Sequence, residues 1–147
     1  HYIDQINPKQ QQDARWNKLI ALIHILDHEQ RLHERCEEEE YRAKLVQISP
    51  DLHTEQQRLI HGNNNIISAI SSNQFSDARK YARKNEKHII KSMEPYRNMI
   101  AEMMAKDDIT LSSGTSKLEA ARWLIRVSHH IARITYHMEK AVLYTTK

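Results

Sequence analysis

The chain has 147 residues, the size of one domain, and its 28% charged residues leave a net charge of +3. Two glycines and three prolines leave little turn chemistry for a sheet, and the single Cys36 excludes a disulfide framework and fits a reducing compartment. The mixed charge argues against a nucleic-acid partner, and no apolar run approaches the roughly 20 residues of a membrane span.

A first helix is predicted over about 8–47. Pro8 suits the first helical position, and apolar residues recur at steps of three and four along 16–32. The acidic run 37–40 is interpreted as a solvated continuation of this helix. Pro50 marks its end, because the residue before a proline is pushed out of the helical region.

A second helix is predicted from Ser49, which would cap it, to about Ile70. The "HGNNN" stretch at 61–65 has poor helix propensity, with glycine about 1 kcal/mol less favourable than alanine. The apolar spacing stays in phase across this stretch. We therefore expect one helix with a weak middle.

A third helix is predicted to start at a cap formed by Asn73 or Ser76 and to run to about Lys106. Its apolar stripe continues through most of this length. Pro95 lies inside the pattern and should kink or interrupt the helix, because it lacks a backbone N–H.

A fourth helix is predicted after the loop-like "DDITLSSGTS". Ser116 and Glu119 have the spacing of a capping box, and an apolar stripe follows from Leu118 to Val142. Four long helices joined by short loops predict an all-α fold, an antiparallel up-and-down bundle formed by the single domain 1–147.

The first and fourth helices share an internal repeat. A shift of 102 positions places "LIHILDHEQRLHERCEE" from Leu22 on "LIRVSHHIARITYHMEK" from Leu124. The two helices should therefore pack together, with His28 and His130 at comparable depth. The identical pairs are Leu22 with Leu124, Ile23 with Ile125, His28 with His130, Arg31 with Arg133 and Glu37 with Glu139.

The stretch "RWLIRVSHHIARI" resembles the signature helix of PhoU-like domains, Arg-Tyr-Leu-Glu-Arg-Ile-Gly-Asp-His-Ala-x-x-Ile. Arg133 after His130 looks like the PhoU-like tails of bacterial sodium/phosphate cotransporters, and "LDHEQRLHERC", which contains Arg31, looks like the matching helix of the first half. The resemblance implies two three-helix repeats, of which this chain holds the last helix of the first and all of the second. The matching positions are Arg122, Trp123, Leu124, Arg126, Val127, His130 and Ile134.

The resemblance implies a cytoplasmic regulatory domain of a sodium-dependent phosphate cotransporter, at the inner face of a bacterial inner membrane. The domain would modulate phosphate uptake without being an enzyme, and its partner would be the transmembrane part of the same transporter. The chain begins at His1 without a methionine, which indicates a tag remnant or a fragment of something longer. The resemblance implies a fragment of a longer membrane protein. Self-association into a homo-oligomer stays open.

The chain departs from the family at the acidic Glu-x-x-x-Asp motifs that are implicated in metal clusters. The equivalent pairs here are Ile23 with Asp27 and Ile125 with His129, so each pair has lost its first carboxylate to isoleucine. We therefore expect no tightly bound metal cluster and no other cofactor.

The residues alone leave two further interpretations open. His24 and His28 are four residues apart, so both can chelate a transition metal, with Asp27, His129, His130 and His137 as further candidate ligands. That pattern would suit a stand-alone metal-binding four-helix bundle, a hemerythrin-like or ferritin-like sensor or oxidase. The other interpretation is a helical protein-interaction scaffold.

The simpler structural interpretation places His28 and His130 at a helix–helix contact, bonded to carboxylates or carbonyls. Under it, Arg31 and Arg133 pair with Glu29, Glu86 or Glu94 across the bundle.

Overall fold

The structure, a computed structural model, describes residues 8–37 and 40–145. Every regular element in these ranges is helical, and the helices pack against one another, which confirms the predicted all-α bundle. The helices are α1 (Pro8–Glu37), α2 (Glu40–Ile48), α3 (His53–Ser71), α4 (Phe75–Ala105) and α5 (Leu111–Leu143), with a short 3-10 helix η1 (Pro50–Leu52) before α3.

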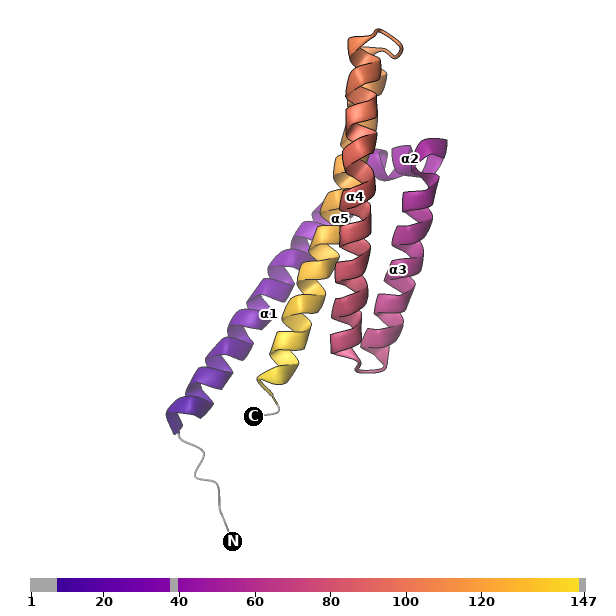
Figure 1. Cartoon of the computed structure of the whole chain (residues 1–147). Helices are drawn as coiled ribbons and strands as arrows, with labels where there is room; N and C mark the ends of the chain where they lie inside the picture. The colour runs from indigo at the N-terminus through magenta and orange to yellow at the C-terminus, as the bar shows by residue number, and fades with distance from the viewer. Residues whose placement is uncertain (1–7, 38–39, 146–147) are drawn as a thin grey trace.

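The long helices form an open row in the order α1, α5, α4, α3 (Figure 1). Neighbouring helices in this row run in opposite directions, as the bundle prediction requires. α5 packs against both α1 and α4, whereas α3 packs chiefly against α4. α2 crosses the row and contacts α5 before the chain turns into α3. The two edges of the row, α1 and α3, therefore have fewer neighbours than α4 and α5.

The core lies where α4 and α5 meet and where α2 and α3 close over them. Its side chains come from helical positions three or four residues apart, as the apolar periodicity of the sequence requires. Each large apolar side chain that is fully buried here contributes about 1.5–3 kcal/mol to folding. The most buried large members are Leu52, Ile89, Met93, Ile100 and Leu124.

The predicted first helix over 8–47 is two helices with different directions. α1 ends at Glu37 and α2 begins at Glu40, while the rest of the acidic run, 38–39, lies outside the described residues. The change of direction brings Val46 into the core, where its side chain is 2% exposed. The apolar pattern predicted one continuous helix, but the burial of α2 against α5 favours two helices instead.

Three predicted helix starts are wrong. Ser49 is the N-cap residue of η1 but makes no side-chain cap bond, and α3 begins at His53. α5 begins at Leu111, because the side chain of Thr110 accepts a hydrogen bond from the backbone N–H of Ser113 at 3.1 Å. Ser116 therefore lies inside the helix, and Glu119 pairs with Arg42 of α2 at 3.5 Å instead of closing a capping box.

α4 begins at Phe75 with Gln74 as its N-cap residue, and no side chain caps it. Neither Asn73 nor Ser76 therefore has the predicted role. Asn73 instead has a positive φ of 58° in the tight turn after α3. A short turn that uses a left-handed residue takes the place of a side-chain cap.

The weak middle of α3 and the proline of α4 both stay helical. α3 is continuous through 61–65, as predicted. α4 is also continuous through Pro95, so the predicted interruption is wrong. Met93 and Tyr96 are buried on either side of the proline and hold this segment in the core. The loss of one backbone hydrogen bond is offset by this packing.

The apolar stripe of α1 is largely uncovered. Trp16, Leu19, Ile23 and Leu26 are 61%, 47%, 52% and 65% exposed, respectively. The first buried side chain of α1 among the described residues is Ala21, which is 4% exposed. The open row explains this exposure, because α1 has α5 on one side and no long helix on the other.

Candidate functional site

Five histidines gather where α1 and α5 pack together. His24 and His28 lie one turn apart on α1, while His130 and His137 lie two turns apart on one side of α5. These four residues, which we call the histidine seam, make ring contacts across the helix pair. His129 lies at the edge of the seam, with its ring centroid 6.4 Å from that of His28.

His28 and His130 form the centre of the seam. Their Nδ1 atoms are 3.1 Å apart, and both residues are half-buried. The prediction that the two histidines meet at comparable depth is therefore confirmed. The expected carboxylate or carbonyl partners are wrong, because the two imidazoles bond to each other: one Nδ1–H donates and the other Nδ1 accepts.

Burial keeps three imidazoles of the seam uncharged. The pKa of His130 is lowered to about 4, first by burial and then by the positive charge that His28 would carry. The pKa of His137 is also lowered to about 4, by burial and then by the guanidinium of Arg133. Burial and Arg133 likewise lower the pKa of His28. At neutral pH these three imidazoles are neutral, which allows the His28–His130 hydrogen bond.

His24 and His137 stack face to face. Their ring centroids are 4.6 Å apart, with 20° between the ring planes. The stack covers one side of His137, and Arg133 lies 3.2 Å from its Nε2. His137 thus joins the two helices as much as His130 does. His137 follows His130 by seven residues, or two helical turns, and this spacing was the sequence signal that both face α1.

The arginines of the motif helices bind close neighbours. The Arg31 guanidinium pairs with Asp27 on the same helix, with Nε 3.1 Å from the carboxylate oxygen. Arg133 contacts His137 and lies over the Tyr136 ring, with its Cζ 4.8 Å from the centroid. The expected pairs with Glu29, Glu86 or Glu94 are therefore wrong for both arginines. On the remaining motif positions, Arg122 is exposed and Arg126 half-buried.

Polar contacts that the sequence did not predict hold α4 against α5. Glu86 of α4 lies 2.8 Å from Nδ1 of His129, and Arg79 of α4 donates to Glu139 at 2.8 Å. Arg79 also lies over the Tyr136 ring, at 4.7 Å. Long-range pairs of this kind have no sequence spacing that would reveal them.

The candidate metal ligands are engaged with different partners. Asp27 is bound to Arg31, His129 to Glu86, and His28 to His130, while His24 is stacked on His137. Among residues 8–37 and 40–145, no group of three or more His, Cys, Asp or Glu side chains is arranged to hold a metal ion. In this arrangement the seam is a helix–helix contact made of imidazoles.

An apolar groove lies between the two edges of the row. It has a volume of about 270 Å³ and is bounded by α1, α3 and α5. Apolar surface is therefore exposed at two places on α1: in this groove and along the α1 stripe. The lining residues are Leu32, Asn63, Ile66, Ile67, Ile70, Ile131, Ile134 and Thr135.

The chain matches no protein-family model, no curated protein and no solved structure. Within the part of the chain that the structure describes, no helix is both long enough and apolar enough to cross a bilayer.

Proposed function

We propose that this chain is a PhoU-like regulatory module of a sodium-dependent phosphate cotransporter, which modulates phosphate uptake from the cytoplasmic face of the membrane. The module works by binding the transmembrane part of the same transporter and catalyses no reaction. The proposal joins the family resemblance of the two motif helices to one structural observation, the contact between His28 and His130.

That contact supports the repeat on which the resemblance depends. Any two antiparallel helices are related by a local twofold axis, which passes between the residues that meet at their crossing. The sequence repeat pairs position 28 with position 130 through its shift of 102, without reference to the structure. In the structure His28 and His130 contact each other, so one pair of repeat-equivalent positions meets between α1 and α5. This is the arrangement expected of two related halves that face each other.

The α1 stripe supports the second part of the proposal, binding to another protein surface. Monomeric proteins rarely leave large contiguous apolar patches in water. Trp16, Ile23 and Leu26 lie on the side of α1 that α5 does not cover. Aromatic and aliphatic side chains of this kind form the buried centres of protein interfaces. We assign this stripe to the contact with the transporter.

The test is phosphate uptake by cells that express the complete transporter, with or without this module, at high and low external phosphate. We expect deletion to change the ratio of the two uptake rates at equal membrane expression, because the pore would lie elsewhere in the protein. An unchanged ratio would contradict a regulatory role. Hydrolytic or redox activity of the isolated chain would contradict the whole proposal.

Point variants make the test sharper. Ile23→Asp combined with Leu26→Asp should change the uptake ratio as deletion does, because the charges prevent apolar docking while both positions are exposed enough to leave folding intact. Ile48→Asp combined with Leu111→Asp is the matched control, at positions that are 72% and 73% exposed on other helices. Equal effects of the two double variants would count against the assigned surface.

A further inference from the structure

One side of α4 carries a concentration of positive charge that neither the bundle nor the histidine seam uses. Six of the 22 Lys and Arg residues lie within 79–91, where Glu86 is the one acidic residue. Arg79 and Glu86 bind residues of α5. The other five define what we call the basic face: Lys80, Arg83, Lys84, Lys87 and Lys91.

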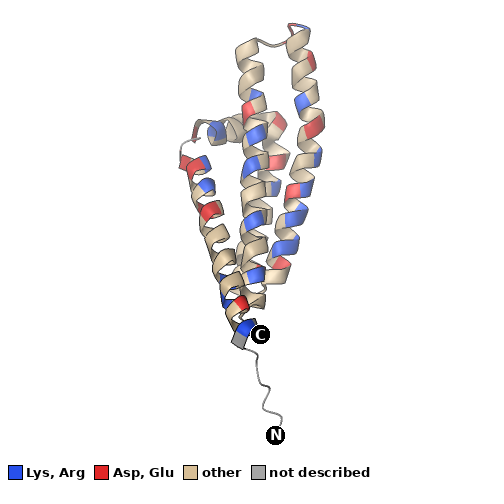
Figure 2. Ribbon diagram, turned by 90° about the vertical axis from the view of Figure 1, so that its left-hand side faces the viewer, with Lys and Arg blue, Asp and Glu red and all other residues tan. Residues whose placement is uncertain are grey.

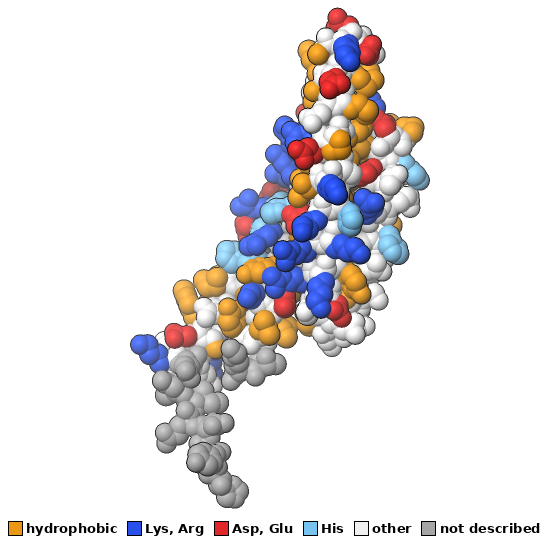
Figure 3. Space-filling view, in the orientation of Figure 1, with side chains coloured by type: hydrophobic (Ala, Val, Ile, Leu, Met, Phe, Trp, Pro, Cys, Tyr) orange, Lys and Arg blue, Asp and Glu red, His pale blue; other side chains and the backbone are white. Residues whose placement is uncertain are grey.

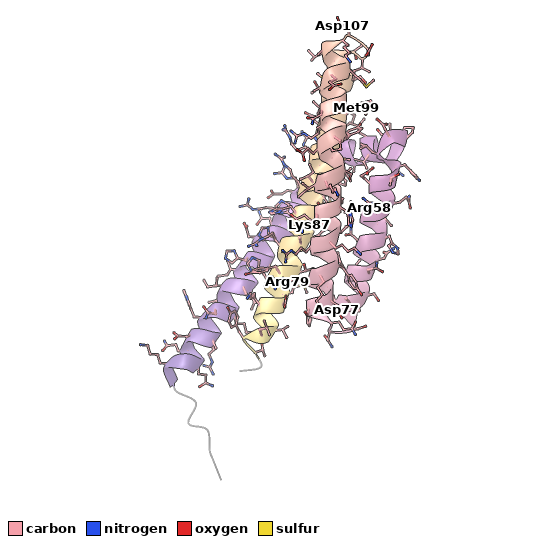
Figure 4. All side chains as sticks on the ribbon, viewed as in Figure 1. Arg58, Asp77, Arg79, Lys87, Met99 and Asp107 are labelled. Carbon is pink, nitrogen blue, oxygen red and sulfur yellow. The ribbon has the colours of Figure 1, made fainter. Side chains whose placement is uncertain are left out.

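The basic face is a continuous strip along the solvent side of α4. Its residues are spaced by one, three or four positions, which places them on one side of the helix over about 17 Å. All five side chains are exposed. Figure 2 shows the charged bands along the outer side of α4, and Figure 3 shows Lys and Arg gathered over its N-terminal half. Figure 4 shows Lys87 on α4 between Asp77 and Asp107, which lie near the two ends of the helix.

The positive charge of this strip is largely uncompensated. Lys80 has a loose pair with Asp77 at 3.6 Å. Arg83, Lys84, Lys87 and Lys91 have no ion pair among the described residues. Lys80 with Lys84, Arg83 with Lys87, and Lys87 with Lys91 are like charges four residues apart, which is unfavourable for an isolated helix. An anionic partner would relieve this repulsion.

The form of the surface favours a broad anionic plane as that partner. The side chains of 80–94 on this side of α4, with Glu94 at one end, border one open depression of about 670 Å³. Tyr81 and Ile90 are 45% and 44% exposed, and helical geometry places one at each edge of the strip. Cations flanked by an aromatic and an aliphatic side chain are typical of helices that lie on membrane surfaces.

We propose that the basic face of α4 binds the anionic surface of a phospholipid membrane, with α4 parallel to the surface and Tyr81 and Ile90 at the level of the headgroups. This proposal rests on the charges of α4 alone and is independent of the phosphate-transport proposal above. It assigns the outer side of α4, opposite its contact with α5, to the membrane.

The test is sedimentation of the 147-residue chain with vesicles of phosphatidylcholine, alone or mixed with phosphatidylglycerol. We expect binding to the mixed vesicles only, and a steep loss of binding as sodium chloride is raised, because salt screens surface charge. Equal binding to both kinds of vesicle, or binding that is insensitive to salt, would overturn the proposal.

The variant Lys84→Gln/Lys87→Gln/Lys91→Gln should bind the mixed vesicles about 100-fold more weakly, which corresponds to roughly 1 kcal/mol per lysine. The matched control, Lys18→Gln/Lys44→Gln/Lys106→Gln, removes the same charge from other parts of the surface and should bind within about 2-fold of the parent chain. Circular dichroism verifies that both variants are folded. Similar losses in the two variants would show a response to net charge alone and would overturn the assignment to α4.

Two competitors identify the source of the negative charge. Inorganic phosphate at millimolar concentration should leave vesicle binding unchanged, because a single anion spans only a small part of the strip. Duplex DNA should compete weakly. If either competitor displaces the chain at concentrations where anionic vesicles are in excess, the membrane is not the partner of this face.

Discussion

The indole Nε1–H of Trp123 donates a hydrogen bond to the backbone carbonyl of Arg35 at 3.0 Å. Arg35 lies in the last turn of α1. The bond from Trp123 therefore ties the last turn of α1 to α5. The bond thus lies near the change of direction between α1 and α2, which the sequence did not predict.

Replacing Trp123 with phenylalanine should lower the free energy of unfolding by about 1 kcal/mol, because a ring remains in the core but the hydrogen bond to the Arg35 carbonyl is lost. Urea denaturation measures the change as a lower midpoint with an unchanged slope. Trp16→Phe is the matched control, since Trp16 is 61% exposed, and should shift stability by at most about 0.5 kcal/mol. Equal effects at the two positions would show that the indole bond contributes little.

Acid should destabilise the chain through the histidine seam. The pKa values of His130 and His137 are about 4 in the folded chain, below the ordinary value of 6.5. The unfolded chain therefore binds more protons in this interval, so stability is complete above pH 6.5 and falls as the pH drops toward 4. The loss should be roughly 1 kcal/mol per histidine once solvent screening is allowed for.

Urea midpoints measured between pH 7 and pH 4.5 test this expectation. His130→Gln should flatten the pH dependence, because glutamine does not titrate there. His53→Gln, at an exposed position on α3 away from the seam, should leave the dependence as it is. A pH dependence that His130→Gln leaves unchanged would show that the loss of stability arises elsewhere.

Gly62 lets α3 approach α4. A Cβ at this position would lie 2.7 Å from Cγ of Asn85, whose side chain is buried. Gly62→Ala gains about 1 kcal/mol of helix propensity but forces Asn85 to move at an overpacking cost of about 1–3 kcal/mol. We expect a net loss of roughly 1 kcal/mol by urea denaturation. The double variant Gly62→Ala/Asn85→Ala should recover the stability that is lost through the clash with the Asn85 side chain. The control Asn64→Ala, at an exposed position in the same weak stretch, should not be destabilising.

The sequence predicted the fold class and the pairing of α1 with α5 because both depend on patterns that survive in any tertiary context. Helical periodicity reports that a segment has an apolar side, and a repeat places equivalent residues in equivalent positions. His28 and His130 could therefore be matched before the structure was known. Neither pattern states what covers an apolar side, so the exposure of Trp16 and Leu26 was not predictable.

The remaining differences arise from competition between local signals and packing. Thr110 and Ser116 are both residue types that cap helices well. The helix is capped by Thr110, so α5 begins about a turn and a half before the predicted start. The turn from α1 into α2 follows from the burial of Val46, which a continuous pattern conceals. The basic face was missed because the net charge of +3 averages a concentrated patch with acidic residues elsewhere. The positions of the Lys and Arg residues along α4 reveal the basic face, whereas the total charge of the chain does not.

The first half of α1 should exchange its backbone amide hydrogens faster than the second half. Among the described side chains of 9–20 none is buried, whereas Ala21, His28 and Leu32 contact the rest of the bundle. Local opening of the first half therefore exposes little additional apolar surface and should require less free energy. Hydrogen exchange followed by mass spectrometry should show at least about 10-fold weaker protection of 12–20 than of 24–35 in dilute protein. Equal protection would mean that another surface covers the α1 stripe in solution, and a rise in protection with protein concentration would identify that surface as a second copy of the chain.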